Sequence, residues 1–128
     1  SDFKFGTADV IEGKFRGCIN LQAISALDTP NFTGTTSLAA MFESCVNFTG
    51  GPAMNNWDVR GVTDMTNMFF SNQLFNSNIS AWDVGNVTNM QGMFSGASVF
   101  NQPIGSWNVT NVTNKIIRYK LCIFFTQL

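Results

Sequence analysis

The sequence predicts an α/β repeat fold, a solenoid of about four to five coils in which each coil combines a short helix with a short strand. Two observations carry this prediction. Trp57, Trp82 and Trp107 stand 25 residues apart, twice over, and the residues between them recur in register. Within each unit, the apolar spacing changes from one typical of a helix to one typical of an extended segment.

The two central units repeat most clearly. Residues 57–81 are WDVRGVTDMTNMFFSNQLFNSNISA, and residues 82–106 are WDVGNVTNMQGMFSGASVFNQPIGS. Trp, Val, Val-Thr, Met, Met-Phe, Phe-Asn and Ile occupy the same places in both. Matches over this length do not arise by chance, so both segments are predicted to be regular repeats.

The pattern continues toward the N-terminus with weaker matches. Residues 27–56 form a longer unit, and this irregular coil is expected to carry insertions at residues 30–34 and 50–52. Residues 1–26 hold a fainter copy, which predicts a degenerate N-terminal coil.

The pattern also continues toward the C-terminus. Residues 107–128 keep the Val and Val-Thr positions, but Lys115 and Arg118 replace Met90 and Met93 of the preceding unit. Burying two unpaired cations is costly, so this segment predicts a degraded last repeat or a cap. The whole chain is thus expected to form a single repeat domain.

The spacing within one unit predicts its shape. Steps of three and four residues predict a short helix, whose buried face would consist of Val87, Met90, Phe94 and Ala97. Thr88 and Asn89 suit the start of this helix, and Gly96 suits its end. The spacing that follows suits an extended segment made of Phe100, Ile104, Trp107 and Val109. Neither element buries its apolar face alone, so the units must stack.

Stacking in register places equivalent aromatic residues above one another. Each buried aromatic side chain removes roughly 150–250 Å² from water, which suits a chain with only 12% charged residues. The predicted core ladder consists of Trp57, Trp82, Trp107, Phe69, Phe94, Tyr119, Phe75, Phe100 and Phe125.

The composition argues against catalysis and against nucleic-acid binding. The chain has no histidine, which removes the usual general base and the Ser-His-Asp and Cys-His nucleophiles. A net charge of −1 and seven scattered Lys and Arg offer no basic stripe for a polyanion. We therefore expect no enzyme, no cofactor and no nucleic-acid partner. Few charges and many Asn, Thr, Ser and Gly favour an extracellular or cell-surface location.

The apolar end of the chain does not predict a membrane span. Residues 116–128 are 13 residues long and include Arg118 and Lys120, whereas a spanning helix needs about 20 apolar residues.

Asn-x-Ser/Thr sequons are frequent in this sequence. They are candidate glycan acceptors if the chain is secreted by a eukaryote, and they start at Asn31, Asn47, Asn78, Asn86, Asn108 and Asn111. The alternative is structural, because Asn-Val-Thr belongs to the repeat itself and suits turns and caps.

The cysteines and acids each allow two interpretations. Cys18 and Cys45 occupy the same repeat position on neighbouring units, so a disulfide is one prediction and small buried free thiols are the other. Asp58 and Asp83, with Asn108, form a ladder of oxygens at one corner. Two carboxylates are too few for calcium, so bonds to turn amides are the expected role. No metal site is predicted.

The unit from Trp82, WDVGNVTNMQGMFSGASVFNQPIGSW, resembles the 25-residue repeat of the BspA-like leucine-rich-repeat surface proteins. Met41-Phe42-x-x-Cys45-x-x-Phe48 is similar to the core of the related treponemal-type repeat. The resemblance covers about residues 14–128 and is strongest from 57 to 113. It implies a right-handed leucine-rich-repeat-like solenoid with a parallel sheet on one face, in secreted or surface-displayed proteins associated with adhesion.

Two functions follow as expectations. The first is a binding or adhesion module whose exposed sheet face contacts a protein or glycan partner. The second is a structural subunit that associates with itself through solenoid ends or faces, in an extracellular fibre or surface layer.

Overall fold

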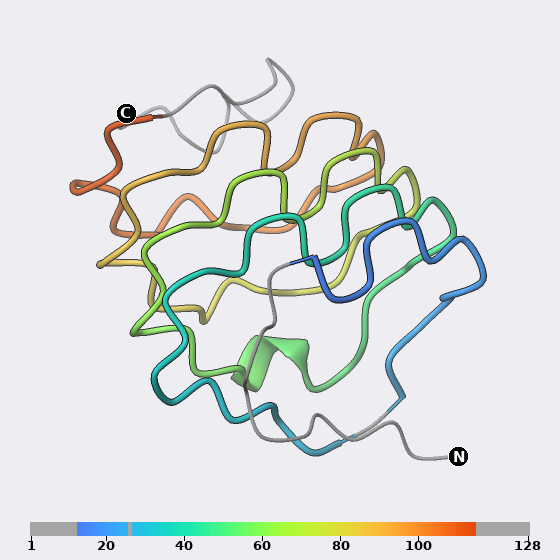
Figure 1. The fold of residues 1–128 in the computed structure, drawn as a ribbon, viewed down its shortest axis with the longest axis horizontal. Helices are drawn as coiled ribbons and strands as arrows, with labels where there is room; N and C mark the ends of the chain where they lie inside the picture. Colours follow the sequence, from blue (N-terminus) through green and yellow to red (C-terminus); the bar gives the residue numbers. More distant parts are fainter. Residues whose placement is uncertain (1–12, 26, 115–128) are drawn as a thin grey trace.

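The repeat units lie side by side in chain order in the computed structural model, which describes residues 13–25 and 27–114 (Figure 1). The chain runs around each unit once before it enters the next. Neighbouring units are joined by isolated parallel bridges, which pair Ser37 with Asp64, Asp64 with Asn89, and Asn89 with Asn114. The stack therefore places equivalent residues of successive repeats next to each other.

The predicted secondary structure is wrong. Within the described ranges, the one helix is the 3-10 helix η1 (Met54–Asn56), and no strand is formed. The predicted α/β repeat fold, with its right-handed leucine-rich-repeat-like solenoid and a parallel sheet on one face, is therefore contradicted. The units do stack, but each unit is built from turns and irregular backbone.

Consecutive turns stand where the helix was expected. Every second N–H group of residues 38–45 bonds to the carbonyl three residues back, at 3.1–3.2 Å; the donors are Met41, Glu43 and Cys45. The alternate N–H groups reach the next unit at 2.8–3.0 Å, from Leu38, Ala40, Phe42 and Ser44 to Asp64, Thr66, Met68 and Phe70. Backbone donors are thus satisfied without either a helix or a strand.

This alternation needs a left-handed backbone at every fourth residue. Ala40 has a φ of 56° and Ser44 a φ of 61°. Equivalent positions of other units share the positive φ, and they are Asn67 and Ser71, Gly13 and Gly17, and Gly92 and Gly96. An α-helix keeps φ near −60° throughout, so these residues exclude one.

A column of tryptophans runs through the interior. The rings of Trp57 and Trp82 stack at 6.0 Å with 12° between their planes, and those of Trp82 and Trp107 at 6.4 Å with 3°. All three side chains are at most 4% exposed. Ring stacking thus joins the units in the interior, in addition to the backbone hydrogen bonds between them.

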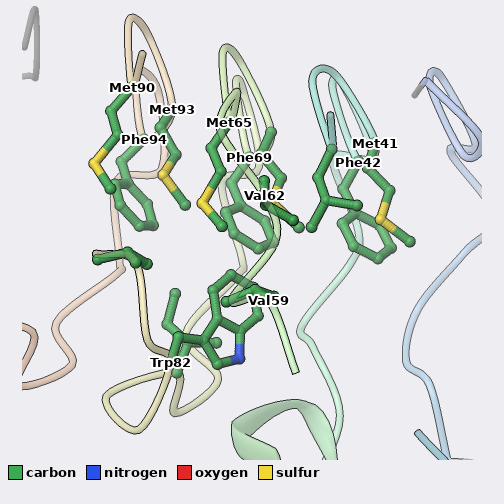
Figure 2. Packing of buried hydrophobic residues seen from close by; sticks show 14 of the residues in the cluster. Met41, Phe42, Val59, Val62, Met65, Phe69, Trp82, Met90, Met93 and Phe94 are labelled. Carbon is green, nitrogen blue, oxygen red and sulfur yellow. The ribbon is translucent and has the colours of Figure 1, made fainter. Parts of the chain in front are cut away.

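Two columns of phenylalanines run beside the tryptophans. Phe42, Phe69 and Phe94 stack at 5.7 Å in both steps. Phe48, Phe75 and Phe100 stack at 5.8 and 5.5 Å. Methionines pack against the first of these columns, as Figure 2 shows for Met41, Met65, Met90 and Met93. Tyr119 and Phe125 of the predicted ladder lie outside the described residues.

The longer N-terminal unit places its extra residues at one point only. Thr63 donates to the carbonyl of Thr36, 27 residues earlier, whereas Thr88 donates to Thr63, 25 residues earlier. The difference of two residues falls between Phe48 and Met54, before η1, where the insertion at residues 50–52 was expected. Phe48 and Phe75 stack 27 residues apart, whereas Met54 and Ile79, which accept the equivalent tryptophan bonds, are 25 apart. Residues 30–34, expected as an insertion, lie in register with the next unit.

Candidate binding surface

One exposed corner of each unit is built from the same turn. A side-chain oxygen accepts a hydrogen bond from the N–H group two residues on: Asn31 from Thr33 at 3.0 Å, Asp58 from Arg60 at 3.2 Å, Asp83 from Gly85 at 3.0 Å and Asn108 from Thr110 at 3.2 Å. We call these four turns the Asx corner. The oxygens of Asp58 and Asp83 thus serve turn amides. Within residues 13–25 and 27–114, no three His, Cys, Asp or Glu side chains cluster as metal ligands.

Asp58 and Arg60 form an ion pair on this corner. Arg60 donates from Nε to Oδ1 and from Nη2 to Oδ2 of Asp58, both at 2.9 Å. These hydrogen bonds hold the pKa of the Asp58 carboxyl at about 2, below its ordinary 3.8. Both side chains are more than half exposed, so the pair shapes the surface more than it stabilises the fold.

Threonine hydroxyls join the units beside the corner. Thr63, Thr88 and Thr113 each donate a hydroxyl proton to the carbonyl of the equivalent threonine one unit earlier, at 3.2 Å. These threonines are exposed, but their hydroxyls are engaged in bonds between units, so this row of threonines has a structural role.

Asparagine side chains close the gap between units at two levels of the Asx corner. Asn86 Nδ2 donates to the carbonyl oxygen of Arg60 at 2.7 Å, and Asn111 Nδ2 donates to that of Gly85 at 2.6 Å. One unit earlier in the chain, Gly61 occupies the position equivalent to Asn86. It has no side chain that could bond to the carbonyl of Thr33.

A groove of about 610 Å³ opens at this level. It is lined by residues 29–34 and by Asp58, Arg60 and Gly61. Phe32 and Trp57 lie beneath the surface here, only 6% and 4% exposed. The groove therefore presents hydroxyl, amide, carboxylate, guanidinium and backbone carbonyl groups.

The six sequon asparagines are all exposed, and each makes a side-chain hydrogen bond. Three donate from Nδ2 to a carbonyl of the preceding unit, and these are Asn47, Asn86 and Asn111. Three accept at Oδ1 from the N–H group two residues on, and these are Asn31, Asn78 and Asn108. Turn and clamp roles account for the repetition, and glycosylation stays a prediction.

The cysteine position is filled differently in each unit. Cys18 is exposed and Cys45 is buried, and both are free thiols, so the structure holds no bridge between them. Cys45 Sγ donates to the carbonyl of Phe15 at 2.8 Å, and burial raises the pKa of its thiol. The equivalent Asn72 and Ala97 are buried, as expected of a slot for small side chains. The third cysteine, Cys122, lies outside the described residues.

Asn72 places a buried polar amide at this repeat position, where Cys45 and Ala97 are buried in the neighbouring units. Its Oδ1 accepts from the N–H group of Cys45 at 3.1 Å, whereas its Nδ2 has no partner among the described residues. A buried amide donor without an acceptor costs roughly 1–3 kcal/mol.

The sequence interpretation found the corner but missed the groove. Asp58, Asp83 and Asn108 lie on the Asx corner, yet Thr33, Arg60 and Gly61 were not singled out, and Asn31 was named only as a candidate glycan acceptor. The signal that locates the groove is the glycine at position 61, where later units carry Asn86 and Asn111.

Lys115 and Arg118 lie outside the described residues. No helix in the described part of the chain is long and apolar enough to cross a membrane.

Comparison with known proteins gives one match. The family described as "Mycoplasma protein of unknown function, DUF285" matches residues 9–127, nearly the whole chain. No curated protein and no solved structure matches.

Proposed function

We propose that this chain, which belongs to the DUF285 family, is a repeat module that acts outside the cell or on its surface. It binds a protein or glycan partner there, as in adhesion, and it catalyses no reaction. The resemblance of its 25-residue unit to that of BspA-like surface proteins supports this role. Its low share of charged residues, 12%, suits an extracellular setting.

The observation that carries the proposal is the contrast between the inside and the outside of the Asx corner. The position after each turn asparagine or aspartate is buried and apolar in all four units, and the residues are Phe32, Val59, Val84 and Val109. The next position varies in residue type, since it is exposed threonine at Thr33 and Thr110, exposed arginine at Arg60 and half-buried glycine at Gly85. A constant interior with a variable surface is the arrangement by which repeat proteins present binding faces.

The proposal is tested with the purified chain on immobilised matrix proteins and on a printed glycan panel. We expect saturable binding to at least one surface. Thr110→Ala combined with Arg60→Ala should weaken that binding, because both side chains lie on the Asx corner. Gln73→Ala alters an exposed residue away from the corner and should leave binding unchanged. Absence of saturable binding on every surface, with the chain shown to be folded, contradicts the proposal.

A second function, self-association into a fibre or layer, is favoured by a different surface. Leu74 and Val99 occupy equivalent positions of neighbouring units, and each is 46% exposed. Two copies packed through these side chains would bury apolar surface. Concentration-dependent growth in analytical ultracentrifugation, abolished by Leu74→Ser with Val99→Ser, supports this alternative. A wild-type chain that stays monomeric at high concentration contradicts it.

A further inference from the structure

We propose that the groove between Thr33 and Gly61 is a binding site for a neutral saccharide. This inference rests on the proposed function and names a site and a ligand class for it. The groove exists because one side chain is missing from an otherwise repeated bond. At the two later levels of the Asx corner, an asparagine amide spans the gap to a carbonyl of the preceding unit, at 2.7 and 2.6 Å.

Gly61 has no side chain that could make the equivalent bond to the carbonyl of Thr33, and both residues line the groove. A ligand that donates a hydrogen bond to the carbonyl of Thr33 would make the bond that is missing here. In the following unit, Asn86 makes the equivalent bond to the carbonyl of Arg60. The groove volume of about 610 Å³ lies within the range of small-molecule sites. The ligand therefore needs a donor at one end and room for further polar groups.

The charges of the lining favour a neutral ligand. The groove holds one acid and one base, Asp58 and Arg60, and these neutralise each other through two bonds of 2.9 Å. An anion would have to displace Asp58 from Arg60, and a cation would have to displace Arg60 from Asp58. An apolar ligand finds no exposed aromatic surface, because Phe32 and Trp57 are buried.

The hydrogen-bonding groups favour a saccharide over a peptide. Capture of an extended peptide by strand addition requires unengaged backbone N–H and C=O groups in a row. Here the N–H groups of Thr33 and Arg60 are already held by Asn31 and Asp58. What remains is a mixture of hydroxyls, carbonyls and side-chain amide, which matches ligand hydroxyls that both donate and accept.

The test uses the full chain, labelled with ¹⁵N, and follows backbone amide shifts by NMR. The probes, at millimolar concentration, are the methyl glycosides of glucose, galactose, mannose and N-acetylglucosamine, together with lactose and cellobiose. Trialanine and inorganic phosphate are the comparison probes. We expect at least one saccharide to give saturable shifts confined to residues 29–34 and 58–61.

Gly61→Asn is the decisive variant, because it supplies the clamp that the later units possess. The added side chain fits: a Cβ at Gly61 meets only the Thr35 carbonyl oxygen at 3.5 Å, and its φ lies outside the left-handed region. We expect saccharide affinity to fall about tenfold or more, since one lost hydrogen bond has that effect. Asn111→Gly, the reverse change two units later, removes a bond to Gly85, which does not line the groove, and should keep wild-type affinity at this groove.

Three results overturn the inference. They are no groove shifts with any saccharide, saccharide binding that persists unchanged in Gly61→Asn, and a groove that responds only to trialanine or phosphate. The proposed function is tested separately. If saccharides fail while the chain still binds a surface through its Asx corner, this inference falls and the binding role stands. If the chain binds neither an immobilised surface nor a saccharide in the NMR experiment, the binding role falls together with this inference.

Discussion

The indole Nε1–H group of Trp82 donates a hydrogen bond to the carbonyl oxygen of Met54, 2.6 Å away in the preceding unit. Trp107 repeats the contact with the carbonyl of Ile79 at 3.2 Å. Each of these tryptophans therefore serves twice, since its ring stacks in the interior column and its one polar atom joins neighbouring units.

Two substitutions at Trp82 should separate these contributions. Trp82→Ala should lower the free energy of unfolding by about 3–5 kcal/mol, because it leaves a cavity between two stacked rings. Trp82→Phe keeps a ring in the column and loses the bond to Met54, so we expect a loss of roughly 1–3 kcal/mol. Urea denaturation measures both. Equal losses for the two variants would show that stacking does not stabilise the column.

Ala40 holds a left-handed backbone that glycine adopts without strain. Its φ is 56°, and the equivalent residues of two other units are Gly13 and Gly92. The left-handed penalty of roughly 1–2 kcal/mol exceeds the entropy cost of glycine, about 0.5–1 kcal/mol. Ala40→Gly should therefore raise the free energy of unfolding by about 0.5–1 kcal/mol in urea titrations.

Ala53 is the matched control for this substitution. Its φ of −89° is one that alanine accepts, so Ala53→Gly should lower the free energy of unfolding, by about 1 kcal/mol. If Ala40→Gly destabilises the chain as much as Ala53→Gly does, the left-handed assignment at Ala40 is wrong.

The ion pair of the Asx corner predicts an acid titration. The pKa of Asp58 is held at about 2, against an ordinary 3.8, chiefly by its hydrogen bonds to Arg60. Because the folded-state pKa is depressed, the pairing contributes above pH 3.8 and is lost as the pH falls toward 2. Arg60→Gln should return the Asp58 pKa toward its ordinary value in carboxyl ¹³C NMR titrations. An Asp58 titration that is identical in both proteins rejects the pairing.

The two described cysteines should differ in reactivity. Cys18 is exposed, whereas Cys45 is buried, its pKa is raised by burial, and its Sγ donates to Phe15. Alkylation requires a thiolate that the reagent can reach. Iodoacetamide should therefore modify Cys18 well before Cys45 in the folded chain, and urea should remove the difference, as followed by peptide mass spectrometry. Equal rates without urea would contradict the burial of Cys45.

The sequence predicted which residues share a column but not how the backbone connects them. The equal spacing of Trp57, Trp82 and Trp107 determines their stacking, whatever the local conformation. The prediction of a helix was wrong because consecutive turns also bury side chains at intervals of three to four residues, as a helix does. Gly92, which lies inside the expected helix and has a positive φ, is a poor helix former and was the available signal.

The groove was harder to predict because it arises from an absence. A glycine at position 61 predicts nothing by itself. It gains meaning once the structure shows that the amides of Asn86 and Asn111 span the gap between units. Prediction of the groove therefore required knowledge of a bond between residues 26 positions apart. The spacing of residues in the sequence does not reveal such a bond.

The cross-unit bonds also determine how the chain responds to tension. The N–H groups of Leu38, Met65 and Met90 each bond to the following unit, so these bonds run along the stack. A force along that direction is transmitted equally through every unit, and an end unit of the stack, which has a neighbour on one side only, peels before the next yields. Each unit of 25 residues then releases about 80–90 Å of extended chain, at 3.3–3.6 Å per residue. A molecule anchored at both ends would lengthen in steps and dissipate work, as an extensible tether does.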